Sequence, residues 1–229
     1  MNKKILICIT SVFLVLLALV AAFIFQKTKK STTKTQKSSS TMRVSGSNCT
    51  IKKIKHTEKK VYSEEYQNEA EQQLENWKQK TSFSPENPLM VWNPYGTNTG
   101  SFYYYARSEQ ESYVECQITP QKGSVLKNRL KNDGEDGVTS EHEYLITGLA
   151  PGQSNEIKLS FYNTSDELLK EETYTVQLKE DSKIPAITNV EKGDSTTPLS
   201  EGLFAVLGHD KSVAKNIYYY DNDGVSRGR

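Results

Sequence analysis

The chain between residues 85 and 180 alternates short apolar runs with turn residues. Each run is rich in β-branched or aromatic residues and is bounded by Gly, Pro, Asn or Asp, which is the pattern of strands joined by turns. The runs are Leu89–Trp92, Phe102–Ala106, Tyr113–Ile118, Tyr144–Ile146, Ile157–Tyr162 and Tyr174–Leu178. Strands of this length and spacing are typical of a two-sheet sandwich. The sequence therefore predicts a mainly β fold with a β-sandwich over residues 85–180.

Three stretches inside this region add detail. Residues 147–152 place Leu149 between a Gly and a Pro-Gly turn, as where the chain crosses between sheets in fibronectin type III-like domains. Residues 122–141 are polar and predict a long surface connection with room for a short strand. The run Phe102–Tyr105 should turn two rings into the core and two outward. We expect a neighbouring domain to cover the outward pair, with simple exposure as the alternative.

A short amphipathic helix is predicted within residues 61–84. Strong helix formers follow Ser63, which can cap the first turn. One narrow apolar stripe recurs at helical spacing: Val61, Tyr62, Tyr66, Ala70, Leu74 and Trp77. We expect this stripe to pack on its own domain. A coiled-coil partner is the alternative, but the helix is short for one.

Residues 1–26 carry the longest apolar run in the chain. Ile5–Phe25 is 21 residues without a charge, enough for a helix to cross a bilayer. We expect an uncleaved transmembrane anchor, with a signal peptide cut before Phe23 as the alternative. Lysines flank both ends and do not settle the orientation. Residues 27–60, rich in Ser, Thr and Lys, predict a disordered spacer.

Residues 181–229 have the pattern of a linker followed by the first strands of an incomplete domain. An apolar stretch at 202–208 and the strand-like run Ile217–Tyr220 precede the turn residues Asp221–Gly224. Two strands and a turn are too few to form a domain. We therefore expect the opening of a second β domain whose remainder is missing.

Composition and candidate chemistry narrow the function classes. Lys plus Arg number 29 against 28 Asp plus Glu, so a net charge of +1 gives no field that would attract nucleic acid. His56, His142 and His209 are scattered without the paired spacing of metal sites. Asp221–Gly224 resembles half a calcium loop but lacks the distal glutamate, so a tight turn is preferred. We assign no catalytic, cofactor-binding or metal-binding residue and expect no cofactor.

The cysteines allow one disulfide. Cys49 lies in the predicted spacer and Cys116 in a predicted strand, so a bridge between them is one interpretation. The alternative is a buried free thiol at Cys116 and an unrelated Cys49. Cys8 is read as an apolar residue of the membrane segment. None of these readings implies catalysis.

Three stretches together resemble the bacterial arylsulfotransferase family, the aryl-sulfate sulfotransferases. Asn87–Gly96 and residues 145–162 are similar to the family's N-terminal β-sandwich domain, and residues 202–228 to the segment where its β-propeller begins. The resemblance implies an exported enzyme that moves a sulfuryl group from a phenyl sulfate to a phenol through a sulfated histidine. The family's catalytic residues belong to the propeller, so none can be placed on this chain. The resemblance therefore implies an N-terminal domain that is inactive as this fragment.

The expected partners follow from these assignments. They are membrane lipid through Ile5–Phe25, and the missing propeller domain or a second copy of the chain, with the body on the extracytoplasmic side. The alternative function is a stand-alone, anchored fibronectin-like ligand-binding or adhesion module. Under that alternative, residues 202–229 should close onto the sandwich as strands of its own; under the first reading they should be loose and exposed.

Overall fold

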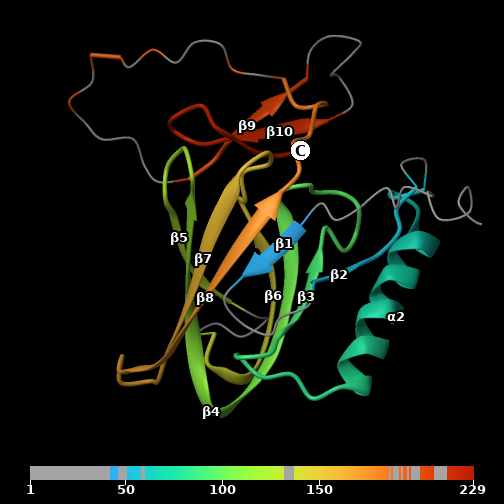
Figure 1. Cartoon of the computed structure of the whole chain (residues 1–229), viewed down its shortest axis with the longest axis vertical. Helices are drawn as coiled ribbons and strands as arrows, with labels where there is room; N and C mark the ends of the chain where they lie inside the picture. Colours follow the sequence, from blue (N-terminus) through green and yellow to red (C-terminus); the bar gives the residue numbers. More distant parts are fainter. Residues whose placement is uncertain are drawn as a thin grey trace, which may run out of the picture. The chain divides into compact units, whose positions relative to one another are not determined.

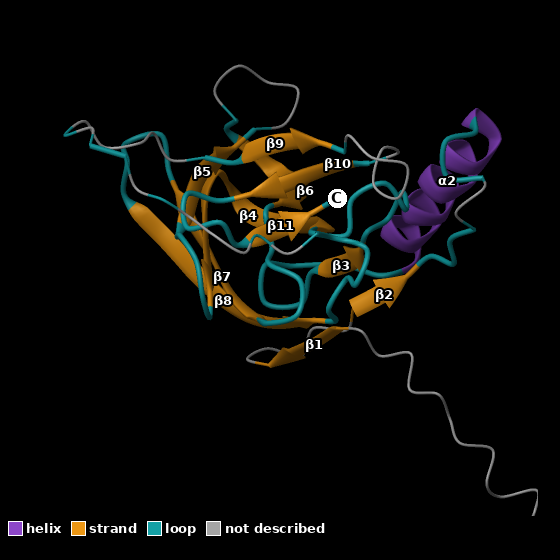
Figure 2. Ribbon diagram, turned by 90° about the horizontal axis from the view of Figure 1, so that it is seen from above, coloured by secondary structure: helices purple, strands orange, loops and turns teal. Residues whose placement is uncertain are grey.

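The chain folds into two packed β-sheets, a covering helix and a small C-terminal sheet (Figures 1 and 2). The computed structural model describes residues 51–57, 60–131, 137–185, 202–208 and 216–229, the backbone of 42–45, and single positions at 187, 191, 193, 194 and 196. All statements below concern these residues. They belong to one compact unit, residues 40–229.

The elements of the described chain are mostly strands. Their bounds are β1 Met42–Ser45, β2 Ile51–Lys53, α2 Glu64–Lys80, β3 Leu89–Trp92, β4 Ser101–Pro120, β5 Leu126–Leu130, β6 Thr139–Thr147, β7 Ser154–Tyr162, β8 Leu168–Leu178, β9 Phe204–Leu207, β10 Ile217–Tyr220 and β11 Ser226–Gly228. The predicted runs at 102–106 and 113–118 are two parts of one strand, β4. The short strand for which the polar connection had room is β5.

The long strand β4 joins the two sheets of the sandwich. Its first part, residues 101–107, pairs with β3 and β6. Its second part, residues 113–120, pairs with β5 and β7. A register irregularity separates the parts between Arg107 and Ser112, where the ladder with β6 is interrupted. Because such an interruption bends a strand, β4 can leave one sheet and enter the other.

The core lies between the two sheets and follows the period-2 alternation of the strands. Phe102, Tyr104 and Ala106 of the first part of β4 face Val114 and Ile118 of the second part across this core. Side chains of β6, β7 and β8 complete it, among them Ile146, Ile157, Leu159, Phe161, Tyr174 and Val176. The prediction of a mainly β sandwich is therefore confirmed, including the two rings of the aromatic run that point inward.

Helix α2 covers the outer face of the sheet that contains β3 (Figure 1). Ser63 caps the helix by accepting a hydrogen bond from the Tyr66 backbone N–H at 3.4 Å. Leu74 packs with the outward rings Tyr103 and Tyr105. The apolar stripe thus packs on its own domain, as expected. The expectation that a neighbouring domain covers the outward tyrosines is wrong, because α2 of the same chain does so.

Two sequence predictions concern residues N-terminal to the sandwich, the disordered spacer and the membrane anchor. Residues 27–60 were predicted to be a disordered spacer, but β1 pairs with β8 and β2 pairs in parallel with β3. Their backbones find partners at open sheet edges, which composition does not reveal. The predicted anchor Ile5–Phe25 lies outside the described residues. Among those described, no helix is both long and apolar enough to cross a membrane.

Residues after 201 form a separate sheet in the order β11-β10-β9. Tyr218 and Tyr220 of β10 are buried, and Arg227 of β11 is buried completely. This sheet joins neither sheet of the sandwich, yet it is not loose. Neither expectation fits the described residues of this segment, 202–208 and 216–229: they form a sheet of their own, and Arg227 bonds it to the sandwich without adding a strand to either sandwich sheet.

Candidate functional site

The most specialised arrangement in the described chain is a buried ion pair that fastens the C-terminal sheet to one end of the sandwich. Arg227 donates to Asp221 Oδ2 from Nε at 2.9 Å and from Nη2 at 2.7 Å. Its Nη1 donates to the Gly148 carbonyl at 2.9 Å, and Nη2 also donates to the Ser124 carbonyl. Both charged side chains are fully buried. One guanidinium thus connects β11 with two separate connections of the sandwich.

Asp221 completes this arrangement from the turn between β10 and β11. Its Oδ1 accepts the backbone N–H groups of Asp223 at 3.0 Å and Val225 at 2.9 Å, which closes the turn. Its Oδ2 accepts the Ser124 N–H at 2.9 Å. A carboxylate with this many donors is matched to a buried cation, so the pair has its hydrogen bonds satisfied. The predicted tight turn at 221–224 is present, and Arg227 holds the oxygen that a calcium ion would need.

Glycines let the two parts approach closely. A Cβ on Gly100 would lie 2.0 Å from the Arg227 carbonyl oxygen, and one on Gly123 would lie 2.5 Å from Asp221 Oδ2. Both distances are far below van der Waals contact. The tract at 147–152 contributes as well, since Gly148 has a positive φ and directs its carbonyl to Arg227. The sandwich end is therefore shaped to receive this sheet.

Further bonds attach the C-terminus and the linker. The Thr99 N–H donates to the Arg229 carbonyl at 3.2 Å, and the Arg229 Nε donates to Asp181 Oδ2 at 2.8 Å. The Tyr220 hydroxyl donates to the Pro185 carbonyl at 2.7 Å. The chain leaving the sandwich at β8 is thus tied to the sheet that follows it.

Strand β9 remains open at the opposite edge of this small sheet. Among the strands that the structure describes, it pairs with β10 alone, and all four of its residues are exposed. Phe204 is 50 % and Val206 43 % exposed on one face of the strand, and Leu207 is 70 % exposed on the other face beside its cross-strand neighbour Ile217. An apolar edge strand with unpaired backbone groups is a surface on which another strand or sheet can pack.

Of the two histidines that the structure describes, His142 is the buried one, and hydroxyl groups surround it. Its Nε2 lies 3.0 Å from Ser108 Oγ and 3.2 Å from Ser112 Oγ, and its Nδ1 lies 3.1 Å from the Tyr144 hydroxyl. Ser108 donates its own proton to the Gln110 carbonyl at 2.6 Å. His142 must therefore donate to Ser108 from Nε2 and accept from Tyr144 at Nδ1. This tautomer fixes the fold around the β4 bend and does not activate the serine.

The other two histidines do not join it. His56 contacts the Tyr66 hydroxyl beside α2, and burial lowers the pKa of its imidazole. His209, which precedes Asp210 in the sequence, lies outside the described residues. The structure thus brings no two of the three histidines together among the residues it describes.

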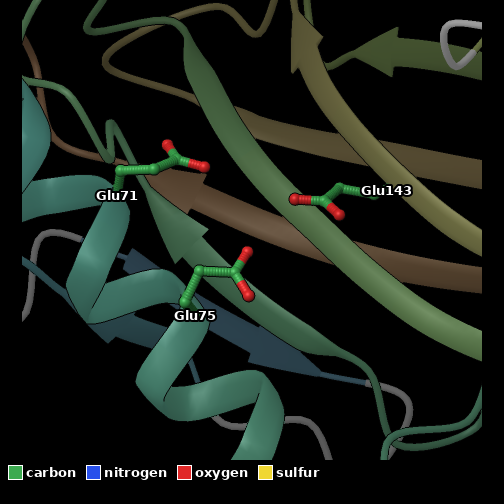
Figure 3. Close-up of side chains that lie close together, drawn as sticks. All are labelled: Glu71, Glu75 and Glu143. Carbon is green, nitrogen blue, oxygen red and sulfur yellow. The ribbon is translucent and has the colours of Figure 1, made fainter.

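Three carboxylates converge between α2 and the sheet, but the chain's own donors occupy them (Figure 3). Oxygens of Glu71, Glu75 and Glu143 lie within 4.8 Å of one another. Lys78 pairs with Glu75 and, at 2.9 Å, with Glu143. Tyr95 donates to Glu71 and Tyr103 to Glu143, each at 2.6 Å. The cluster is therefore explained as the polar contact of α2 with the sheet. Burial and the neighbouring glutamate both raise the pKa of Tyr103.

Cys116 is a free thiol buried in the core. Burial raises its pKa to about 12, which keeps it protonated and inert. The reading of Cys116 as a buried free thiol is therefore the correct one, and a bridge to Cys49 is not formed. Cys49 itself lies outside the described residues.

Sequence reasoning missed the ion pair. Arg227 and Ser124 are 103 positions apart, and Arg227 and Gly148 are 79 apart. The available signals were Gly123 and Gly148 beside turn residues, together with a lone Arg after an Asp-rich turn. Neither signal identifies its partner, because only the fold brings them together.

Comparison with known proteins finds a family that the sandwich resembles. Residues 89–179 match the profile of the family described as the arylsulfotransferase Ig-like domain. That range runs from the start of β3 to just after β8 and includes the bend of β4 that joins the two sheets. No curated protein and no solved structure matches the chain significantly. Over residues 89–179 the chain is therefore similar to the arylsulfotransferase Ig-like domain.

Proposed function

We propose that this chain is the N-terminal, non-catalytic domain of a membrane-anchored, extracytoplasmic arylsulfotransferase. In this proposal it holds a catalytic β-propeller, in which a histidine would carry the sulfuryl group from a phenyl sulfate to a phenol. The observation that carries the proposal is the family match over residues 89–179. The anchor would be Ile5–Phe25, which is apolar over its whole length.

The C-terminal sheet supports a holding role. A partner domain can be held in a fixed orientation only through a rigid mount, and the Arg227–Asp221 pair supplies rigid, directional bonds to the sandwich. The exposed strand β9 then offers an apolar edge to the partner. The propeller would pack on β9 and continue the sheet.

Binding in trans tests this role. A purified arylsulfotransferase propeller that lacks its Ig-like domain should bind the full chain in detergent. Phe204→Ser with Leu207→Ser should weaken that binding roughly tenfold or more, because exposed apolar contact is lost. Leu168→Ser is the matched control, since Leu168 is 54 % exposed on β8, outside the small sheet.

An activity assay completes the test. The chain alone should not transfer sulfuryl groups from 4-nitrophenyl sulfate to a phenol above the uncatalysed background. Turnover by the chain alone would contradict the non-catalytic assignment, and failure to bind the propeller would contradict the holding role.

A stand-alone ligand-binding module is the second candidate. The observation in its favour is that residues 216–229 are closed onto the sandwich through buried contacts, as that reading requires in part. It would be preferred if the chain binds no propeller and the β9 variants change nothing in the assay above.

A further inference from the structure

The outer face of the β1-β8-β7-β4-β5 sheet carries a polar trough. It has a volume of about 460 Å³, and its lining comes from β4, β5 and β7. Strand β4 forms the floor, because it pairs with β5 on one side and with β7 on the other. Gln117 of the floor lies opposite Lys127 on β5 and opposite Lys158 on β7. The two lysines therefore stand on opposite walls of the trough.

The outer faces of the two sandwich sheets differ in what covers them. The face of the β3 sheet carries Leu89, Val91, Tyr103 and Tyr105, and α2 covers it. On the trough face the outward positions of β4 are Glu115 and Gln117, and among the described elements no helix lies over it (Figure 2). Its composition suits a wet surface that can exchange water for a polar ligand.

The charges of the trough favour an anion. Three cationic side chains, Lys127, Arg129 and Lys158, line it with one acidic side chain, Glu115. Lys158 pairs with Glu171 at 3.1 Å. Both charged groups of this pair stay accessible to solvent, since the two side chains are 37 % and 42 % exposed. With Glu115 and Glu171 counted against Lys127, Arg129 and Lys158, the trough keeps one cation in excess. A ligand with negative groups on both sides would meet a cation on each wall.

One end of the trough is aromatic. Tyr162 of the lining stacks beside Tyr113, with ring centroids 5.2 Å apart and planes at 19°. The Arg129 guanidinium lies 3.6 Å from the centre of the Tyr113 ring, and the Tyr113 hydroxyl donates to Asp166 at 2.7 Å. These contacts hold the rings in place. Fixed tyrosines beside cations give a ligand ring an apolar surface next to its charge.

We propose that this trough binds an extended carbohydrate chain that carries carboxylate or sulfate groups. Two strand spacings separate its walls, roughly 10 Å, which admits one such chain along β4. Lys127 and Lys158 face the anionic groups from the two walls, and Tyr162 contacts a sugar ring. The proposal is independent of arylsulfotransferase function.

Calorimetry on the full chain in detergent tests the proposal. The probes are a heparin-derived tetrasaccharide and tetragalacturonate as anionic chains, maltotetraose as a neutral chain, and sodium sulfate as a bare anion. One or both anionic tetrasaccharides should bind with a Kd below about 1 mM, and maltotetraose and sulfate should bind at least about tenfold more weakly. Sulfate binding as tight as that of the tetrasaccharides would overturn the carbohydrate assignment.

Variants locate the site. Lys127→Ala with Lys158→Ala should weaken tetrasaccharide binding roughly tenfold, and Glu115→Gln should strengthen it about threefold. Lys55→Ala with Lys80→Ala removes the same charge at exposed positions elsewhere and should change Kd less than about twofold. All of these side chains are at least partly exposed, so folding is preserved. Equal losses in the two double variants, or no binding of either anionic chain, would overturn the proposal.

Discussion

At the scale of single residues, Arg227 should contribute more to the stability of the C-terminal sheet than any neighbour. Arg227→Met leaves the Asp221 carboxylate buried without its cation and removes the bonds to Gly148 and Ser124. Breaking a buried pair on one side costs about 3–5 kcal/mol. We expect urea denaturation, followed by the far-UV circular dichroism signal, to show a loss of this size in the free energy of unfolding.

The double variant Arg227→Met, Asp221→Asn is the control for this prediction. It removes both charges, so it should recover part of the stability that the single change loses. An additive double variant would mean that the two side chains act independently, contrary to the bonds between them.

His142 should make the fold sensitive to mild acid. Burial lowers the pKa of His142 from 6.5 to about 4. In the unfolded chain the His142 imidazole therefore becomes protonated near pH 6.5, whereas in the folded chain it becomes protonated only near pH 4. The stabilising effect is full above pH 6.5 and is lost as pH falls towards 4, by about 3 kcal/mol.

Chemical denaturation at pH 7.5, 6.5, 5.5 and 4.5 checks this dependence. His142→Gln should flatten most of the slope between pH 6.5 and 5, where carboxylates contribute little. A smaller slope of the same sign should remain, because burial also lowers the pKa of His56. An unchanged slope in His142→Gln would show that the buried imidazole does not carry the effect.

Sequence reasoning at this scale reached local features and missed long-range ones. The turn at Asp221–Gly224 was predicted because its residues are neighbours. The state of Cys116 was one of two open readings, since exposure decides whether a thiol can pair and the sequence does not give exposure. The burial of Arg227 depends on Ser124 and Gly148, which lie far along the chain. A charged residue near a chain end gives no sign that it is a core residue.

At the scale of elements, the packing of the C-terminal sheet against the end of the sandwich should depend on Gly100. A Cβ there would collide with the Arg227 carbonyl, whose backbone cannot move without disturbing β11. Gly100→Ala should therefore loosen β10 and β11 and leave the sandwich folded. Amide hydrogen exchange should become faster for residues 217–228 and stay unchanged for β7 and β8.

Gly193→Ala is the matched control for that change. A Cβ on Gly193 would meet nothing within 4 Å, so exchange should stay as in the parent chain. If Gly100→Ala also leaves the exchange of residues 217–228 unchanged, the C-terminal sheet packs less tightly against Gly100 than the distances indicate.

The elements that sequence predicted well are those whose pattern is local. The strand at Leu89–Trp92 and the helix within 61–84 have the periodicity of their secondary structure. The union of two predicted strands into β4 was not visible, because the residues between them are polar and exposed at a bend. Strands β1 and β2 were missed because polar segments become strands when a sheet edge offers backbone bonds.

At the scale of the whole molecule, the uncovered surface of β9 should decide how the chain associates. Both faces of this open edge strand are apolar and exposed, Phe204 and Val206 on one face and Leu207 with the neighbouring Ile217 of β10 on the other, and the strand carries no charge. Water contact with this surface is unfavourable, so the isolated chain should associate as its concentration rises. Phe204→Ser with Leu207→Ser should reduce association in sedimentation velocity experiments without lowering Tm, since neither side chain is buried.

The comparison must be made in one detergent, because the apolar segment Ile5–Phe25 also associates with micelles. Leu168→Ser again serves as the control for an exposed leucine outside the small sheet. A propeller that covers β9 should suppress association of the parent chain and leave the double variant unaffected. If the parent chain and the β9 variant sediment alike at every concentration, the exposed edge is not the contact that draws a partner, and the propeller would have to dock elsewhere on the molecule.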